Sequence, residues 1–333
     1  MSAYTFRFSR YLYEVDEVKL SLMMSILDKR KEEALFWAFE LFCSGFVTEL
    51  GELLLNIYDD FYATLNPTFE KHVTNQTNIT ETDLYEIISN MITKQHNVDV
   101  YLLKIIVEQF EIDSSTDDSD LLAFASFILE DPDTSLVLTT LQNLGVFKLS
   151  LQAPRKLMLL RFMQHKQKQH DIEAGCTKKR VLFIKKKNDN DMYEVDVANV
   201  RTYKILELVT KHGIDEHNYL SLFNLKRDRE DIVGAYRNYW LSCAARSPVW
   251  LSRILAHGGS VTEAGMVVFN DEEKEEDFAN KYNLEPDEQK LETQNKTTQY
   301  IRKERTWAGF CKEHNSKGLV KIDEDILADL IKV

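Results

Sequence analysis

Residues 14–67 read EVDEVKLSLMMSILDKRKEEALFWAFELFCSGFVTELGELLLNIYDDFYATLNP, and this stretch decides the fold class. Apolar side chains recur every three or four residues, which predicts helices over 15–28, 31–44 and 47–64. Asn66-Pro67 ends the third helix, because the residue before a proline is pushed out of the helical region. Helices this apolar must be covered by neighbours. The stretch therefore predicts antiparallel helix pairs stacked side by side, an architecture that holds partners and performs no chemistry itself.

The same periodicity continues on both sides of a break in the middle of the chain. The further helices are expected over 82–95, 98–111, 118–130, 134–145, 199–212, 216–225, 228–245 and 248–257, with another opening at the acidic run 270–277 and a polar one from 285 to about 315. Low counts of Gly (11) and Pro (5) suit helices with short loops. The predicted fold is mainly α, as a HEAT-like solenoid or an irregular helical bundle. No repeat of fixed period is found, so the solenoid alternative depends on helix pairing alone.

The break itself predicts a small β-hairpin near 180–197. Two apolar runs, at 180–185 and 193–197, lie on either side of an Asn/Asp-rich turn, and this pattern is a hairpin signal. The polar tract 164–170 just before it is expected to be exposed. Charge divides the chain in the same places, because residues 1–150 carry a net −15, residues 151–188 a net +9 and residues 189–333 a net −7. We therefore predict an acidic helical domain (1–150), a basic linker with the hairpin (151–198) and a second helical domain (199–333).

Composition narrows the class of protein. A net charge of −13 makes the molecule as a whole repel nucleic acid and anionic membranes. The four cysteines, at 43, 176, 243 and 311, are too far apart for a zinc motif, which indicates unpaired thiols and a reducing, intracellular setting. No stretch has the roughly 18 uninterrupted apolar residues of a membrane span, and the N-terminus lacks the apolar core of a signal peptide. We expect an intracellular protein with no membrane partner.

One segment reverses the acidic character of the chain, and it is the predicted anion- or partner-binding site. Its six basic residues flank the apolar run Val181–Ile184 and are Lys178, Lys179, Arg180, Lys185, Lys186 and Lys187. The first interpretation is a solvated hairpin that contacts the acidic body of the same protein or of a neighbour. An acidic protein partner comes second and the phosphates of a nucleic acid third.

A second candidate is a short helical motif. Tyr203, Leu208 and Val209 have the form Tyr-x-x-x-x-Leu-hydrophobic, which resembles the motif by which translation scaffold proteins engage the messenger-cap-binding factor. The form is permissive, and any amphipathic helix generates it often. It predicts a partner-binding helix.

Signatures of chemistry are not found. His212 and His217 are five residues apart and separated by Gly213, so they do not share a helix face as a metal pair would. Gly258-Gly259 is interpreted as the end of a helix rather than a phosphate loop. We therefore predict no catalytic residues, no metal and no cofactor, and the chain is not expected to be an enzyme.

Four segments carry a resemblance to a known group of proteins: 13–18 (YEVDEV), 33–41 (EALFWAFEL), 246–250 (RSPVW) and 282–289 (YNLEPDEQ). They resemble a group of poorly characterised proteins of nucleocytoplasmic large DNA viruses that infect algae and protists. The segments lie toward both ends of the chain, so the resemblance is full length. It implies a virion or virus-factory role and no known activity.

These observations lead to two functional hypotheses. The first is a non-enzymatic, protein-binding structural component, in the virion or the host cytoplasm, whose partners are viral or host proteins. The alternative is a helical scaffold in viral transcription or translation that binds a cap-binding factor or nucleic acid. An enzyme of unrecognised type is the third class.

Overall fold

The computed structural model describes residues 6–74, 79–109, 154–176, 183–185, 212, 232–282, 309–310, 313 and 318–320. It confirms the mainly helical fold with a small antiparallel hairpin. The chain forms two compact units, each assembled from separated stretches of sequence. Unit 1 comprises Met1–Leu53, Thr77–Ile92 and Lys185–Glu304, and unit 2 comprises Leu54–Gln76, Thr93–Ile184 and Arg305–Val333. The predicted domain boundaries near 150 and 198 fall outside the described residues, so the three predicted domains stay a prediction.

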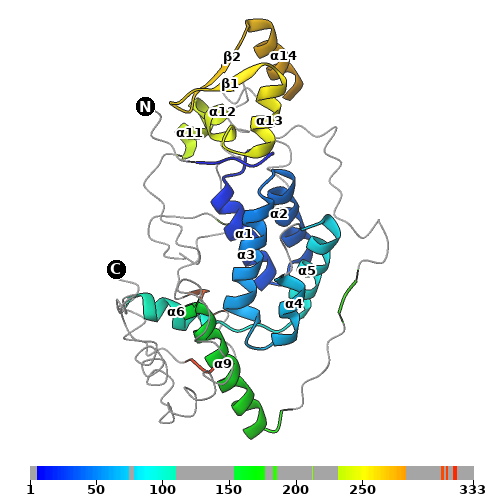
Figure 1. Ribbon diagram of the computed structural model, residues 1–333, viewed down its shortest axis with the longest axis vertical. Coiled ribbons are helices and arrows are strands. Elements are labelled where there is room, and N and C mark those ends of the chain that lie inside the picture. Colours follow the sequence, from blue (N-terminus) through cyan, green and yellow to red (C-terminus); the bar gives the residue numbers. More distant parts are fainter. Residues whose placement is uncertain are drawn as a thin grey trace. The chain divides into compact units, whose positions relative to one another are not determined.

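The elements follow the chain in the order seen in Figure 1. They are α1 (Val15–Leu27), α2 (Lys31–Cys43), α3 (Val47–Ile57), a π-helical turn (Tyr58–Tyr62), a 3-10 turn (Pro67–Phe69), α4 (Glu70–Val73), α5 (Glu81–Thr93), α6 (Asp99–Gln109), α9 (Pro154–Glu173), α11 (Ile232–Asn238), α12 (Trp240–Ala244), α13 (Pro248–Ala256), β1 (Gly259–Val261), β2 (Val267–Phe269) and α14 (Glu272–Tyr282). The first three match the helices predicted from residues 14–67, except that the third changes to π-helical geometry after Ile57.

Helix α1 is a central helix of unit 1. It packs against α2, to which it is joined by three residues. Eleven of its 13 side chains are buried, including Ser21 and Ser25, so it is covered on nearly every side. Tyr13, just before α1, packs edge-on against Phe36 and Trp37 of α2, with ring centroids 6.0 and 4.9 Å away. The prediction that these apolar helices must be covered by neighbours is thereby confirmed.

The second part of unit 1 is a small module formed by residues 232–282. In it α11, α12, α13, the hairpin and α14 gather together (Figure 1). Strands β1 and β2 pair antiparallel, with Ser260 opposite Val268. The core of the module also includes the N-terminal residues Phe6, Phe8 and Leu12, so its fold is completed by the other end of the chain.

Unit 2 is built around aromatic rings. Phe61 of the π-helical turn contacts Tyr101 of α6 at 5.3 Å between centroids, and both rings contact Phe310. Asp99, at the start of α6, accepts hydrogen bonds from the backbone N–H groups of Leu319 and Val320, each at 3.0 Å. Residues near the C-terminal end of the chain therefore complete unit 2.

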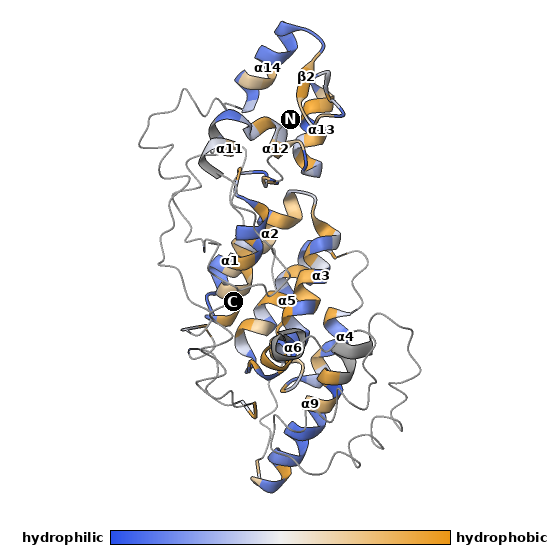
Figure 2. Cartoon of the chain, turned by 90° about the vertical axis from the view of Figure 1, so that its left-hand side faces the viewer, coloured by the Kyte–Doolittle hydropathy of each residue, from blue (hydrophilic) through white to orange (hydrophobic). Residues whose placement is uncertain are grey.

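Helix α9 lies where the sequence pattern predicted no helix. Figure 2 shows hydrophilic residues along much of its length, and the predicted exposure of the polar tract 164–170 is wrong for Lys166 and Gln167, which are buried. Arg161 explains how a basic helix packs here, because its guanidinium makes two hydrogen bonds to the carboxylate of Glu70, at 2.9 and 3.1 Å.

A hairpin occupies 259–269, where none was predicted, and the predicted hairpin near 180–197 is not tested by it. Of the region 180–197, the structure describes only 183–185, which form no regular strand, and the remainder lies outside the described residues. Gly258, predicted to end a helix, does follow the end of α13 and has a φ of +73°. The helix predicted over 228–245 is divided into α11 and α12 at Tyr239.

Candidate protein-interaction surface

The module of residues 232–282 is held in unit 1 by the N-terminal segment, residues 6–14. Trp250 of α13 donates its indole N–H to the carbonyl of Ser9 at 2.9 Å, and the backbone N–H of Val249 donates to the carbonyl of Ser44 at 3.2 Å. Trp250 is fully buried. The position of α13 is therefore fixed by contacts with both the N-terminal segment and the end of α2.

A buried ion pair fixes the N-terminal segment from its other side. Arg10 donates to the carboxylate of Glu40 at 2.8 Å, and the same carboxylate accepts the backbone N–H of Tyr11 at 3.0 Å. Burial raises the pKa of Glu40, while Arg10 and its hydrogen bonds oppose that rise. Losing Arg10 would leave a buried carboxylate without its cation, which is strongly destabilising.

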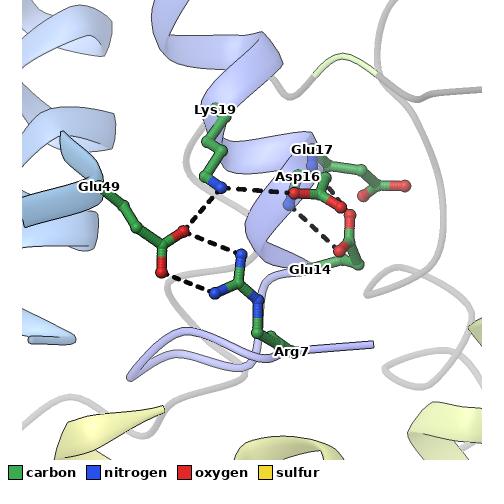
Figure 3. A network of polar contacts seen from close by, with 6 residues as sticks. All are labelled: Arg7, Glu14, Asp16, Glu17, Lys19 and Glu49. Carbon is green, nitrogen blue, oxygen red and sulfur yellow. Dashed lines mark hydrogen bonds and ion pairs between the residues drawn. The ribbon is translucent and has the colours of Figure 1, made fainter. Parts of the chain in front are cut away.

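A second charged network ties the segment to α1 and α3 (Figure 3). Arg7 makes two hydrogen bonds to Glu49, at 2.7 and 3.0 Å, and Lys19 donates to the same carboxylate at 2.9 Å. Burial alone would raise the pKa of Glu49, but the hydrogen bonds from Arg7 and Lys19 outweigh it and lower the pKa to about 2. Glu49 is therefore ionised across the physiological range.

Glu14 begins α1 in the same network and behaves in the opposite way. Its carboxylate accepts the backbone N–H groups of Asp16 at 3.1 Å and Glu17 at 2.9 Å, so it caps the helix (Figure 3). Its pKa is raised to about 8, mainly by complete burial and also by the charges of Asp16 and Glu17, and the two backbone N–H bonds oppose only part of that rise. The charged groups of this network bind one another and the backbone, so we interpret the network as structural.

The exposed apolar side chains are separate from this structural network. Within the described part of the chain, the large apolar residues that are exposed are Ile172 and a group on α13 and the hairpin, which we call the hairpin surface: Leu251, Leu255, Val261, Met266 and Val268. Leu255 is 56% exposed and Val268 is 51% exposed. All five lie within residues 251–268, and a concentration of exposed apolar side chains in one small module is typical of a binding region, whereas single exposed apolar residues are ordinary. The pairing of Ser260 with Val268 and of Val261 with Val267 puts Val268 and Val261 on opposite faces of the hairpin.

The hairpin surface has a rigid support beneath it. Phe269 of β2 contacts Phe278 of α14, with ring centroids 5.1 Å apart, and Trp250 of α13 contacts Tyr282 of α14 at 5.5 Å. Arg253 covers the rings of Trp250 and Tyr282 from 4.4 and 4.9 Å. Because the inward side chains interlock in this way, the outward ones are presented by a fixed framework.

Acidic side chains border the hairpin surface. Between Asp271 and Asp277 the chain carries six acidic residues and one lysine, and all seven are exposed. Figure 2 shows the hydrophilic colour of α14 next to the apolar colour of β2 and α13. The combination can bind a protein segment that is apolar and basic.

The two sites predicted from the sequence lie almost entirely outside the described residues. Lys185 is exposed, while Lys178, Lys179, Arg180, Lys186 and Lys187 lie outside the described residues. Tyr203, Leu208 and Val209 also lie outside them, so both sites stay predictions. His212, weighed above as a metal ligand, donates its backbone N–H to the Ser21 hydroxyl at 2.7 Å.

The sequence contains a signal for the hairpin surface in two apolar runs. The apolar run Met266–Phe269 contains strand β2, in which Val268 faces solvent. Leu251 and Leu255 are four residues apart, as are the buried Trp250 and Ile254, so α13 is apolar on two adjacent faces where one suffices for the core.

Three further observations concern chemistry and environment. In the described ranges, no group of three or more His, Cys, Asp or Glu side chains is arranged to hold a metal ion. Cys43, Cys176 and Cys243 are free thiols. Among the helices that the structure describes, none is both long and apolar enough to cross a membrane.

The segments that carry the viral resemblance supply core contacts. Tyr13, Phe36 and Trp37 pack together, and Trp250 binds the N-terminal segment. Comparison with models of protein families, with curated proteins and with solved structures finds no match. The resemblance stays a prediction, and the geometry of residues 248–282 is the basis for a functional assignment.

Proposed function

We propose that this chain is a non-enzymatic structural protein that binds other proteins through the hairpin surface. The observation that carries the proposal is the concentration of exposed apolar side chains between Leu251 and Val268 on a rigidly packed support. Each such side chain stabilises a complex by about 1–2 kcal/mol when the exposed part of it is buried. Together they offset much of the cost of association, which is about 4–15 kcal/mol, and polar contacts with the partner must supply the rest.

The proposed setting is a large DNA virus, where the protein would be a component of the virion or of the virus factory in the host cytoplasm. The resemblance of the core segments supports this setting. Mass spectrometry of purified particles tests it, because a virion component is expected to be abundant there. Absence from particles would contradict the virion form of the proposal.

The binding role is tested by paired surface variants of the full-length chain. Leu255→Lys with Val268→Lys places two charges in the hairpin surface, and Ile172→Lys is the control, because Ile172 is a 69% exposed apolar residue on α9. Affinity capture from the native cells should recover partners with the wild type and with Ile172→Lys, and should lose at least one of them with the double variant.

Folding is checked by circular dichroism and thermal unfolding, and we expect all three proteins to have similar melting temperatures, since the substituted side chains face solvent. Recovery of the same partners by the double variant would contradict the proposed role of the hairpin surface. An equal loss of partners with Ile172→Lys would show that the effect is unrelated to that surface.

A further inference from the structure

We propose that the guanidinium groups of Arg10 and Arg253 and the hydroxyl of Tyr11 form a binding site for a phosphate group, carried by a free ion or by a phosphate monoester. The three side chains come from the N-terminal segment and from α13, both within unit 1. The site shares no residue with the hairpin surface, so it goes beyond the protein-binding role.

A tight turn of the N-terminal segment places two of these side chains together. The backbone N–H of Leu12 donates to the carbonyl of Ser9 at 2.9 Å and closes the turn. Arg10 and Tyr11 occupy its two central positions, and the Arg10 guanidinium lies 4.5 Å from the centroid of the Tyr11 ring. Leu12 has a φ of +60°, a left-handed conformation that is uncommon for a residue other than glycine. Strained backbone of this kind gathers at ligand sites.

Trp250 brings the second guanidinium to the turn. Its indole N–H donates to the Ser9 carbonyl at 2.9 Å, and the Arg253 guanidinium lies 4.4 Å from the centroid of the same ring. One buried ring therefore contacts the turn at its edge and Arg253 at its face. The two cations are close enough to affect each other, because burial lowers the pKa of Arg253 and the charge of Arg10 lowers it further, while Glu40 and two tyrosines oppose part of that change.

These side chains have hydrogen-bond donors that the described part of the chain does not use. Arg10 donates through Nε to Glu40, and its two terminal nitrogens make no hydrogen bond to the described residues. Within the same ranges, the Arg253 guanidinium has neither a hydrogen-bond acceptor nor an acidic partner. Tyr11 is 3% exposed, and its hydroxyl is buried with no partner in that part of the molecule. A buried donor without an acceptor is costly, so a ligand that accepts from it explains its presence.

The chemistry of these donors favours phosphate over a carboxylate. A guanidinium is a planar fork that binds two oxygens at once, and a tetrahedral phosphate has enough oxygens for two forks and a hydroxyl. Glu40 pairs with only one of the two cations, so a phosphate supplies the negative charge that Arg253 lacks. Arg10 and Arg253 are both partly exposed, which lets a ligand reach them from solvent.

Isothermal titration calorimetry of the full-length chain, in a buffer free of phosphate and sulfate, tests the site with inorganic phosphate and with phenyl phosphate. The wild type should bind at least one of them saturably and should bind acetate at least about tenfold more weakly. Arg253→Gln removes one charged fork and should weaken binding at least about tenfold. Arg246→Gln is the matched control, because Arg246 is an exposed arginine of the same module, and it should bind as the wild type does.

Tyr11→Phe separates a role in binding from a role in folding. Because the lost hydroxyl has no partner among the described residues, the variant without ligand should unfold at the same temperature as the wild type or at a higher one. It should nevertheless bind phosphate roughly three- to tenfold more weakly, and phosphate should raise its melting temperature by less. This comparison is decisive even where Arg253→Gln fails to fold.

The wild type would overturn the proposal by binding neither phosphate ligand saturably, or by binding acetate as tightly as phosphate. Unchanged binding by Arg253→Gln or by Tyr11→Phe would also overturn it, as would an equal loss with Arg246→Gln. A Tyr11→Phe variant that is less stable than the wild type without ligand would show that the hydroxyl already has an internal partner, with the same consequence. Tighter binding of inorganic phosphate would support the site as one for the free ion, and tighter binding of phenyl phosphate would support a monoester.

Discussion

Glu14 and Glu49 belong to one network and respond to pH in opposite directions. The folded pKa of Glu14 is about 8, above its ordinary value of 4.5, so the folded state holds a proton that the unfolded state has released. Its contribution to stability therefore falls as the pH rises from about 4.5 to 8. The folded pKa of Glu49 is about 2, so its contribution is present above pH 4.5 and is lost as the pH falls toward 2.

The variant Glu14→Gln tests this assignment, because it removes the titrating group and keeps one acceptor for the start of α1. Between pH 5 and 8 the free energy of unfolding of the wild type should fall relative to the variant, by up to about 1.4 kcal/mol per pH unit. Urea unfolding at several pH values measures the difference. A difference that does not change with pH would show that Glu14 is ionised in the folded state.

Gly45 occupies a position where a side chain would be strained and would collide with a neighbour. Its φ is +89°, and a Cβ there would lie 2.6 Å from the Cβ of Pro248. Gly45→Ala should therefore cost about 1–2 kcal/mol for the left-handed backbone and a further 1–3 kcal/mol for the collision. Gly265→Ala is the matched control, because its φ is +79° and no atom lies within 4 Å of the added Cβ. Equal losses of stability in denaturant unfolding would contradict the close approach of α13 to the end of α2.

At the scale of elements, the helices of the N-terminal part were predictable and their partners were not. Residues 14–67 have a helical period so regular that α1, α2 and α3 follow from it within a few residues. Helix α9 was missed because Gln164–His170 is polar, and its burial depends on partners distant in the sequence, such as Glu70 for Arg161. The hairpin surface was missed because periodicity shows that residues are apolar and does not show which of them lack a neighbour.

Trp250 links the elements of the module to the N-terminal segment, so its substitution should loosen the module as a unit. Trp250→Phe removes one of the two N–H donors to the Ser9 carbonyl, leaving that of Leu12, and creates a cavity, and we expect a loss of about 2–4 kcal/mol. Hydrogen exchange should accelerate over residues 248–282 more than over α1. Trp240→Phe serves as the control, because Trp240 is only partly buried. Uniform acceleration in both regions would indicate that the module does not open separately.

At the scale of the whole molecule, the sequence indicated an acidic, helical, protein-binding chain. It predicted contact sites at residues 178–187 and 203–209, whereas the proposed surface lies within residues 251–268. The distribution of charge predicted a contact site at residues 178–187, because this run is basic in a chain of net charge −13. Charge alone does not show that apolar side chains within residues 251–268 are exposed to solvent. That exposure depends on the packing of the module, in which Trp250 and Phe278 fill the core.

The central claim is that residues 251–268 contact protein, and site-specific photo-cross-linking tests it most directly. A benzophenone amino acid replaces Leu255 in one full-length chain and Ile172 in another, and each is irradiated in the native cells. Both positions are exposed, at 56% and 69%, so both photoreactive groups face solvent in the isolated chain. The account predicts discrete protein adducts from position 255 that are absent from position 172. No adducts from position 255, or the same adducts from both positions, would contradict it.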